Sequence, residues 1–514
     1  MNLPSLRISY FENIERLQPE EQLVEQKSRF EAVLKRLGSF NREVLSEVGK
    51  LEYDLIDYEI RLNLERIEFG LSWYELESVD ISADGLRDVP LGNEWYAYFL
   101  KRWVDSSVTP EMVYTLGEAE IVRVKSEIRR IQVSSGLNLD EFKDYLQEAN
   151  FFYNSPEEVQ SAFEMAQRGL LKELPKYFPH IEAIGPARIK RNRNRTMAHV
   201  PAYYSNALYF TYSDEPFNRR QIYWIYLHEA LPGHHYQGEL SDELRKSEFQ
   251  RIFSHPSYFE GWAAYIEDLA VEIHLYDDVY SELGKWEWDL IRSVRLVLDV
   301  GLNYYSWSDE KALKFWKKHI EDLDDIGLRE IDRMKRWPAQ VVTYKYGAKQ
   351  FMSWKEEAMK RKLSLYRFHE LLMNIGPLPL SVLDQYLNET EFFEEIGQIE
   401  SIASVHKIAD VQYYSGKDSH PDKHKLDLCL PVGDPTAPLL LWIHGGAWST
   451  GDRKSQTEIA MRFAERGVGV AAISHRLSQP HTPGNHELTS EVQHPEHIKD
   501  VARAFAWLEQ LSLK

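Results

Sequence analysis

Apolar residues recur every three or four positions over most of the first 395 residues, and charged residues fill the positions between them. Segments 23–37, 41–69 and 155–174 show this spacing most plainly. Apolar side chains at that spacing lie on one face of an α-helix, so we predict a mainly α domain over residues 1–395. Residues 197–212 are instead aromatic or alternating and contain a Ser-Asn turn signal, which predicts a small β element, either a hairpin or an edge strand.

The pattern changes near residue 400, where short β-rich runs alternate with helical segments. The expected strands are 407–414, 424–431, 438–446 and 468–474, and the expected helices are 458–467 and 497–511. Alternating strands and helices are typical of an α/β unit with a mainly parallel sheet. We therefore expect a helical domain at 1–395, a linker at 396–404, and part of an α/β domain with a partial parallel sheet at 405–514.

The net charge narrows the classes of partner. Sixty-one Lys and Arg against 81 Asp and Glu give a formal charge of −20, which repels nucleic-acid phosphates and anionic lipid surfaces. No stretch approaches the roughly 18 consecutive apolar residues that cross a bilayer, and residues 1–18 show no secretory signal. We therefore expect a cytoplasmic protein that binds neither nucleic acid nor membrane, with its oligomeric state left open.

The single cysteine, Cys429, limits any metal site to histidine and carboxylate ligands. Such residues concentrate at 228–235, which read His-Glu-Ala-Leu-Pro-Gly-His-His. In the zinc motif His-Glu-x-x-His, two histidines four residues apart on one helix converge on the ion. The fifth position here is a proline, so this chain needs another way to bring its histidines together.

On an unbroken helix neither later histidine can reach the first. His234 would point about 240° away from His228, and His235 would lie about 10 Å along the axis. Pro232 removes an amide of the helix, and Gly233 tolerates unusual torsion angles, so a break is predicted there. The break is expected to fold a later histidine back towards His228.

A third ligand is available in Glu260, which lies at the start of a predicted helix. A His, His, Glu set with one open position is typical of catalytic rather than structural zinc sites. In that scheme Glu229 accepts a proton from water at the ion, and the ion polarises a carbonyl group. The alternative is a helix end whose histidines form local hydrogen bonds. Three histidines and a glutamate within residues 228–235 make that alternative the less favoured one.

These residues belong to a wider resemblance that covers most of residues 1–395. The chain resembles the domain-of-unknown-function 885 family, which comprises largely helical, zinc-metallopeptidase-like bacterial proteins. The family signature, His-Glu-Ala-x-Pro-Gly-His-His-x-Gln, stands at 228–237. Three further blocks match in order, at 260–263, 292–307 and 333–347.

The resemblance implies a zincin-like helical domain that binds Zn²⁺. By analogy with zinc peptidases of the two-His-plus-Glu type, the implied ligands are His228, His234 and Glu260, with His235 as the alternative to His234. Glu229 is the implied general base.

The same resemblance assigns roles on the substrate side. Tyr344 is expected to donate a hydrogen bond to the oxyanion, and Lys345 or Arg295 to bind a substrate carboxylate. The alternative for Arg295 is an ordinary ion pair with Asp299, four residues away on a helix.

The C-terminal segment carries a second motif, His-Gly-Gly-Ala-Trp at 444–448. It resembles the oxyanion loop of arylformamidase-like and carboxylesterase-like α/β-hydrolases, so Gly445 and Gly446 are expected in an oxyanion-like loop. No Gly-x-Ser-x-Gly nucleophile motif occurs in the 514 residues. The apolar strand before the loop is expected to have an open edge. We therefore expect the first half of a hydrolase domain, catalytically inactive and derived from a truncated or frameshifted fusion.

The leading prediction is a zinc-dependent hydrolase of peptide or small amide substrates, carried by the helical domain. A serine esterase or arylformamidase-type fusion is the first alternative, and it lacks a nucleophile here. A non-catalytic helical binding module is the second, and the intact motif at 228–235 together with Glu260 argues against it.

Overall fold

The computed structural model describes residues 18–76, 85–192, 202–204, 206–212, 215–243, 248–321, 323–389, 405–432, 437–446, 448–465, 468–478 and 492–512. The chain divides into two compact units, residues 1–393 and 394–514. The expected linker at 396–404 and residues 1–17, where no secretory signal was found, lie outside the described residues.

The first unit is mainly helical, as the spacing of its apolar residues predicts. Its helices are α2 (Glu20–Leu37), α3 (Glu47–Tyr74), α4 (Gly92–Trp103), α5 (Pro110–Ser134), α6 (Leu139–Tyr145), α7 (Pro156–Glu173), α8 (Ile181–Ile184), α9 (Ile222–Glu229), α10 (His234–Glu243), α11 (Glu248–Ile252), α12 (Pro256–Glu272), α13 (Val279–Asn303), α14 (Asp309–His319), α15 (Asp324–Arg336), α16 (Val342–Lys360), α17 (Leu365–Ile375) and α18 (Leu380–Glu389). Its strands are β1 (Phe152–Tyr153), β2 (Arg188–Arg191), β3 (Ala202–Tyr204), β4 (Ala207–Phe210) and β5 (Phe217–Asn218).

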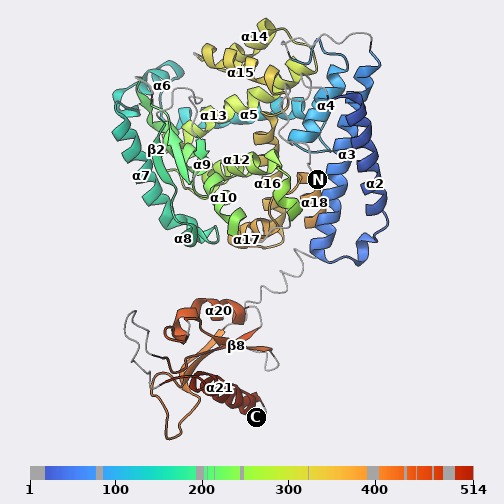
Figure 1. Ribbon diagram of the computed structural model, residues 1–514. Helices are drawn as coiled ribbons and strands as arrows, with labels where there is room; N and C mark the ends of the chain where they lie inside the picture. The colour runs from blue at the N-terminus through green and yellow to red at the C-terminus, as the bar shows by residue number, and fades with distance from the viewer. Residues whose placement is uncertain are drawn as a thin grey trace, which may run out of the picture. The chain divides into compact units, whose positions relative to one another are not determined.

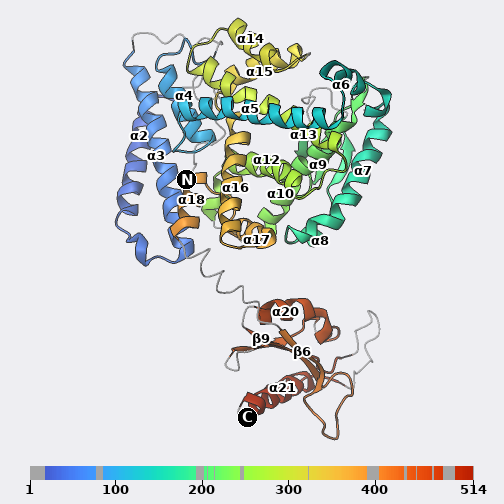
Figure 2. The same ribbon diagram turned by 180° about the vertical axis from the view of Figure 1, so that it is seen from behind.

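The helices of this unit surround a buried centre. Helices α2 and α3 pack side by side at one end, and α7 lies at the opposite end (Figures 1 and 2). Between them α5 packs against α13, and α12 packs against α16. Helix α9 contacts α12 and α13, so the motif at its end lies among central helices.

The predicted β element is a small three-stranded sheet. Strands β3 and β4 pair antiparallel, which confirms the expected hairpin, and β2 adds to β4 in parallel. Helix α7 contacts both β2 and α9, so this sheet lies beside the helix that carries the histidine motif.

Helix α13 is buried along most of its length and nevertheless carries a stripe of polar side chains. These recur at spacings of three and four: Lys285, Asp289, Arg292, Arg295, Asp299 and Asn303. Buried charges are tolerated only when they are paired, so each needs a partner on a neighbouring helix. Helix α13 therefore fixes its neighbours by ionic contacts as well as by apolar packing.

The second unit contains β6 (Val405–Gln412), β7 (Lys425–Pro431), β8 (Leu439–Ile443), β9 (Gly469–Ile473), α20 (Thr457–Glu465) and α21 (Glu496–Ser512). The strand order is β6-β7-β9-β8. Only β8 and β9 pair in parallel, and the other two pairs are antiparallel. The expected partial parallel sheet is therefore a mixed sheet. Helix α20 connects β8 to β9 and allows their parallel pairing.

Strand β8 lies at the end of the strand order and pairs with β9 alone among the described residues. Its residues Leu439 and Ile443 are 44% and 42% exposed. The open edge that the sequence predicts for this strand is confirmed.

Candidate metal centre

A break between α9 and α10 brings two histidines together. Helix α9 ends at Glu229 and α10 begins at His234. A Cβ atom on Gly233 would lie 1.9 Å from the carbonyl oxygen of His228, so only glycine lets the chain fold back this closely against the end of α9. The predicted break between the histidines is confirmed.

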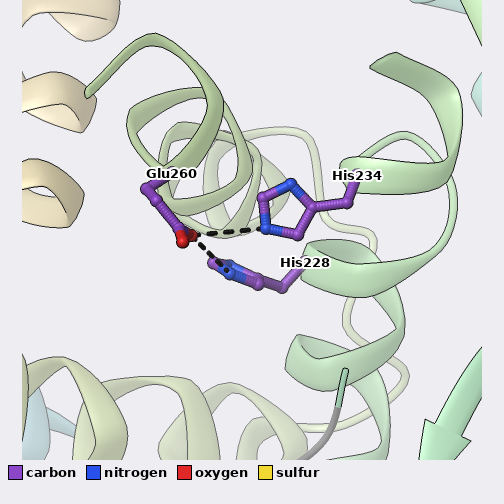
Figure 3. A group of neighbouring side chains, drawn as sticks. All are labelled: His228, His234 and Glu260. Atoms are coloured by element: carbon purple, nitrogen blue, oxygen red, sulfur yellow. Dashed lines mark ion pairs between the residues drawn. The ribbon is translucent and has the colours of Figure 1, made fainter. Parts of the chain in front are cut away.

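The fold brings three potential ligands together from three helices. Nε2 of His234 lies 3.3 Å from Oε2 of Glu260, and Nε2 of His228 lies 3.6 Å from the same oxygen. One ligand atom from each residue lies within 4.8 Å of the other two. Figure 3 shows both imidazoles directed at the carboxylate.

His235 is directed elsewhere. Its Nε2 forms a hydrogen bond of 3.1 Å with the backbone carbonyl of Gly185, and its Nδ1 lies 3.9 Å from Glu239. Of the two alternatives that the sequence leaves open, the geometry brings His234 and not His235 into the group with His228.

The three residues fit a zinc ion. Ligand atoms about 2.0–2.1 Å from zinc at tetrahedral angles lie about 3.3 Å apart. The two separations between histidine nitrogen and carboxylate oxygen, 3.3 and 3.6 Å, are close to that value. Nitrogen and carboxylate donors also match the preference of this ion.

A buried carboxylate that the sequence analysis did not single out fixes the orientation of His228. Oε1 of Glu267 lies 2.7 Å from Nδ1 of His228, so Nδ1–H donates to this carboxylate and Nε2 is left on the side of Glu260. Arg292 on α13 donates to both oxygens of Glu267 at 2.8 and 2.7 Å. Glu267 follows Glu260 by seven residues on α12, and therefore lies on the same helix face two turns along.

The pKa values of His228 and Glu260 indicate that the site stabilises a cation, either a proton or a metal ion, between these side chains. Burial alone would lower the pKa of His228, but the nearby carboxylates of Glu260 and Glu267 raise it to about 9. Burial alone would raise the pKa of Glu260, but the nearby imidazoles of His228 and His234 lower it well below its usual range. A metal cation bound here would replace the proton of His228, so metal binding would release a proton and would weaken as the pH falls.

Two further predicted residues lie near this group. Glu229 is the last residue of α9 and is partly buried. The ring centroid of Tyr344 lies 6.2 Å from that of His228, with 22° between the ring planes. Burial raises the pKa of Tyr344, and the charge of Glu260 adds to this. The phenol is therefore protonated near neutral pH and acts as a hydrogen-bond donor.

The crossing of α12 and α16 sets the distance between Glu260 and Tyr344. A Cβ atom on Gly347 would lie 2.6 Å from Cα of Gly261 and 2.3 Å from the carbonyl oxygen of Ser257. The two helices therefore touch backbone to backbone, which requires glycine at both positions. Each glycine is within three residues of a site residue.

Lys345 lies in a buried ion cluster on the far side of α16 from this crossing. Its Nζ lies 2.6 Å from Glu120 and 2.9 Å from Asp289. Lys285 and Arg123 contribute the other positive charges of the cluster. A substrate-binding role for Lys345 stays a prediction that these contacts do not favour.

Arg295 is also buried in an ion pair, but not the one expected from helical spacing. Its Nη2 lies 2.7 Å from Glu330. Asp299 instead accepts hydrogen bonds from the hydroxyl of Tyr96 at 2.7 Å and from the backbone N–H of Ala339 at 2.9 Å. The substrate-binding role of Arg295 therefore also stays a prediction, with its strongest contact already made to Glu330.

In the second unit, β8 is followed by His444 and then by Gly445 and Gly446. Gly446 has a φ of 121°, a conformation that favours glycine. The ring of His444 stacks on that of His475, with centroids 4.4 Å apart. The oxyanion-like role of the two glycines stays a prediction.

Glu267 is a positioning residue, and its replacement tests the site without removing a ligand. We expect Glu267→Gln to lower zinc affinity about 10- to 100-fold, because the neutral amide holds His228 in the required tautomer less strongly. Competition with a chromophoric chelator measures the change. Glu310→Gln is the control for the change of charge, since Glu310 is an exposed carboxylate in the first turn of α14. Equal affinity in both variants would contradict the role of Glu267.

Two family models match the chain. One, described as "Bacterial protein of unknown function (DUF885)", matches residues 75–387, and the BD-FAE model matches residues 426–513. A curated relative, "Probable carboxylic ester hydrolase LipM" of Mycobacterium tuberculosis (strain ATCC 25618 / H37Rv), is 41% identical over 75 residues. The match covers 14% of this chain and 15% of that relative, so the chain spans a small part of the relative's length. The resemblances stated for both segments are confirmed.

Two solved structures share the fold. "The crystal structure of the putative lipoprotein from Colwellia psychrerythraea" has a TM-score of 0.55 and 21% identity, and covers 74% of each chain. "The structure of a putative lipoprotein of unknown function from Shewanella oneidensis" has a TM-score of 0.51 and 17% identity, and covers 73% of each chain. Among the described residues of this chain, no helix combines the length and apolar character needed to cross a membrane.

Proposed function

This chain belongs to the DUF885 family of bacterial proteins of unknown function, and from its metal-binding geometry we propose that it is a zinc-dependent hydrolase of peptide or amide bonds. The observation that supports the proposal is the convergence of His228, His234 and Glu260 from three helices. Three protein ligands leave a coordination position open for water or substrate. Glu229 is adjacent to the first ligand in the chain.

A zinc ion held by these ligands would supply Lewis acidity, which polarises a carbonyl group and lowers the pKa of water. Glu229 accepts a proton from the attacking water at a carboxylate oxygen and later delivers it to the leaving nitrogen. The Tyr344 hydroxyl donates to the carbonyl oxygen as negative charge develops there. Glu267 holds Nδ1–H of His228 and keeps its Nε2 directed at the site.

The proton-transfer role of Glu229 is tested by Glu229→Gln. We expect hydrolysis to fall by about 10²- to 10⁴-fold, because an amide cannot accept the proton. Bound zinc is expected to stay at the wild-type level, because Glu229 is not a ligand. Digestion of a peptide library, followed by mass spectrometry with and without a chelator, measures activity, and metal analysis of the same samples measures zinc.

Glu310→Gln in the exposed first turn of α14 is the control for the loss of one negative charge, and it is expected to retain full activity. Full activity in Glu229→Gln would overturn the assignment of the base. Wild-type protein that hydrolyses peptides without any bound metal would overturn the proposed function itself.

Ester hydrolysis by residues 405–514 is a second candidate, favoured by the match to the BD-FAE family. We propose that this segment is inactive in the present chain, because no Gly-x-Ser-x-Gly motif supplies a nucleophile. Turnover of a p-nitrophenyl ester that survives Glu229→Gln and is lost on deletion of residues 400–514 would overturn this view.

The cytoplasmic location stays a proposal, as does the absence of nucleic-acid and membrane partners, which rests on the net charge of −20. The names of the two solved neighbours suggest the cell envelope as the competing location. Fractionation of cells that express the natural gene decides between the two: recovery with the envelope would overturn the cytoplasmic assignment.

A further inference from the structure

Arg333, the first residue of the block 333–347, lies close to the candidate metal centre, although the sequence analysis assigned it no role. Its Nη2 donates to Oε1 of Gln340 at 2.6 Å, and its charge lies close enough to the Tyr344 hydroxyl to lower the pKa of that group. Tyr344 in turn lies beside the ring of His228. The side chain of Tyr344 therefore lies between Arg333 and the proposed reacting centre.

The guanidinium of Arg333 is incompletely paired. Its Nε is buried and has no hydrogen-bond partner among the described residues. The nearest carboxylate, that of Glu330, lies 3.8 Å from Nη1, beyond hydrogen-bond distance. Oε1 of that same carboxylate lies 2.7 Å from Nη2 of Arg295.

The carboxylates whose charges act on Arg333 are engaged by other side chains. Glu260 lies 3.3 Å from His234 and 3.6 Å from His228. Arg295 and Arg333 share the single carboxylate of Glu330. The cluster around Lys345 differs, because three cations and three carboxylates meet there: Lys285, Lys345 and Arg123 with Glu120, Asp268 and Asp289. Among the described residues, Arg333 therefore keeps N–H donors that no carboxylate takes up at hydrogen-bond distance, and these donors fit an additional anion.

The chemistry of that anion follows from the donors. A planar guanidinium with free N–H groups matches a carboxylate, which accepts two parallel hydrogen bonds. The side chain of Arg333 is 28% exposed, so an incoming ligand can reach it. A peptide or an acylated amino acid carries such a carboxylate at its C-terminus, a short distance from the last amide bond.

We propose that Arg333 binds the free C-terminal carboxylate of the substrate, so that this hydrolase cleaves the amide bond nearest to that carboxylate. The inference rests on the proposed function and specifies its substrate class as short peptides or N-acyl amino acids with a free acid end. Tyr344 then lies between the carboxylate and the scissile carbonyl, and the other arginine of the pair, Arg295, keeps Glu330 from neutralising Arg333.

Binding to metal-free protein tests the carboxylate site without any turnover. The probe is N-acetyl-alanyl-alanine, compared by calorimetry with the same compound ending in a primary amide. We expect the acid to bind about 10- to 100-fold more tightly, the ratio for a charge-assisted hydrogen bond of about 1.5–3 kcal/mol. Arg333→Met is expected to remove that preference and to leave amide binding unchanged.

Two further variants distinguish the effect of the positive charge at position 333 from a general effect of substitution in α15. Arg333→Lys keeps the positive charge but loses the planar guanidinium, which can donate two parallel hydrogen bonds to a carboxylate. This variant is therefore expected to show part of the wild-type preference for the acid over the amide. Arg336→Met is the matched control, because Arg336 lies on the same helix, is exposed and pairs with Asp332. It is expected to behave as wild type.

Hydrolysis of the same two compounds by zinc-loaded protein separates the two proposals. If neither is cleaved but Arg333→Met still abolishes the acid preference, the proposed function fails and the carboxylate site stands. If peptides are cleaved by a zinc-dependent route with equal efficiency for acid and amide, and the two bind equally, the carboxylate site is overturned. Inorganic phosphate that binds as tightly as the acid would also overturn it, by showing an unselective anion site.

Discussion

His234→Ala is expected to abolish zinc binding, whereas His235→Ala is expected to retain about one equivalent of zinc. The reason is geometric. Nε2 of His234 lies 3.3 Å from the shared carboxylate of Glu260, while Nε2 of His235 is bonded to the carbonyl of Gly185. With one of three protein ligands removed, the two that remain rarely hold zinc against a chelator. Metal analysis after dialysis against a mild chelator measures the difference.

The adjacent positions of these histidines make them controls for each other. Both variants lose one imidazole from α10, so a general loss of folding would appear in both, and circular dichroism would detect it. His228→Ala is expected to match His234→Ala. Zinc retained by His234→Ala and lost from His235→Ala would reverse the assignment, and zinc lost from neither would remove the metal centre.

Gly347→Ala is expected to destabilise the first unit by at least about 3 kcal/mol, near the upper end of single substitutions. The added methyl group would lie 2.3 Å from the carbonyl oxygen of Ser257 and 2.6 Å from Cα of Gly261. Both are backbone atoms, so relief requires the two helices to separate. Separation would also move Glu260 away from Tyr344. Urea unfolding followed by tryptophan fluorescence measures the loss of stability.

Gly169→Ala in α7 is the matched control. A Cβ atom there meets no atom within 4 Å, so the same substitution is expected to raise stability by about 0.5–1 kcal/mol through the lower entropy of the unfolded chain. Zinc affinity is expected to fall in Gly347→Ala and to stay unchanged in Gly169→Ala. Equal stability of the two variants would show that α12 and α16 do not touch as closely as described.

The sequence predicts most of the metal centre. His228, Glu229 and Glu260 stand in recognisable motifs, and the Pro-Gly pair predicts the helix break. A motif and a helix-breaking pair can both be recognised within a few consecutive residues. The choice between His234 and His235 is different. It depends on how far the chain turns back after the break, and that turn is set by the fit of Gly233 against the end of α9.

The charged residues that surround the ligands could not be assigned from the sequence. Glu267 and Arg292 stand 25 residues apart and each fits an ordinary amphipathic pattern, yet both are buried beside His228. Arg295 and Lys345 carry the charge expected of substrate-binding residues, but their partners come from other helices. Spacing along one helix indicates which residues share a face, but not which neighbouring helix that face meets.

The sequence by itself determined the mainly helical first domain, the change of fold class near residue 400, the open edge of the strand at 439–443 and three of the residues at the metal centre. These properties follow from periodicity and from short motifs, which are local. Tertiary structure decided between His234, the implied ligand, and its alternative His235. It alone decided which carboxylate orients His228, that the C-terminal sheet is mixed, and that Arg333 has spare hydrogen-bond donors. All four depend on pairings between segments far apart in the chain, where packing and charge neutralisation select one partner among many of the same residue type.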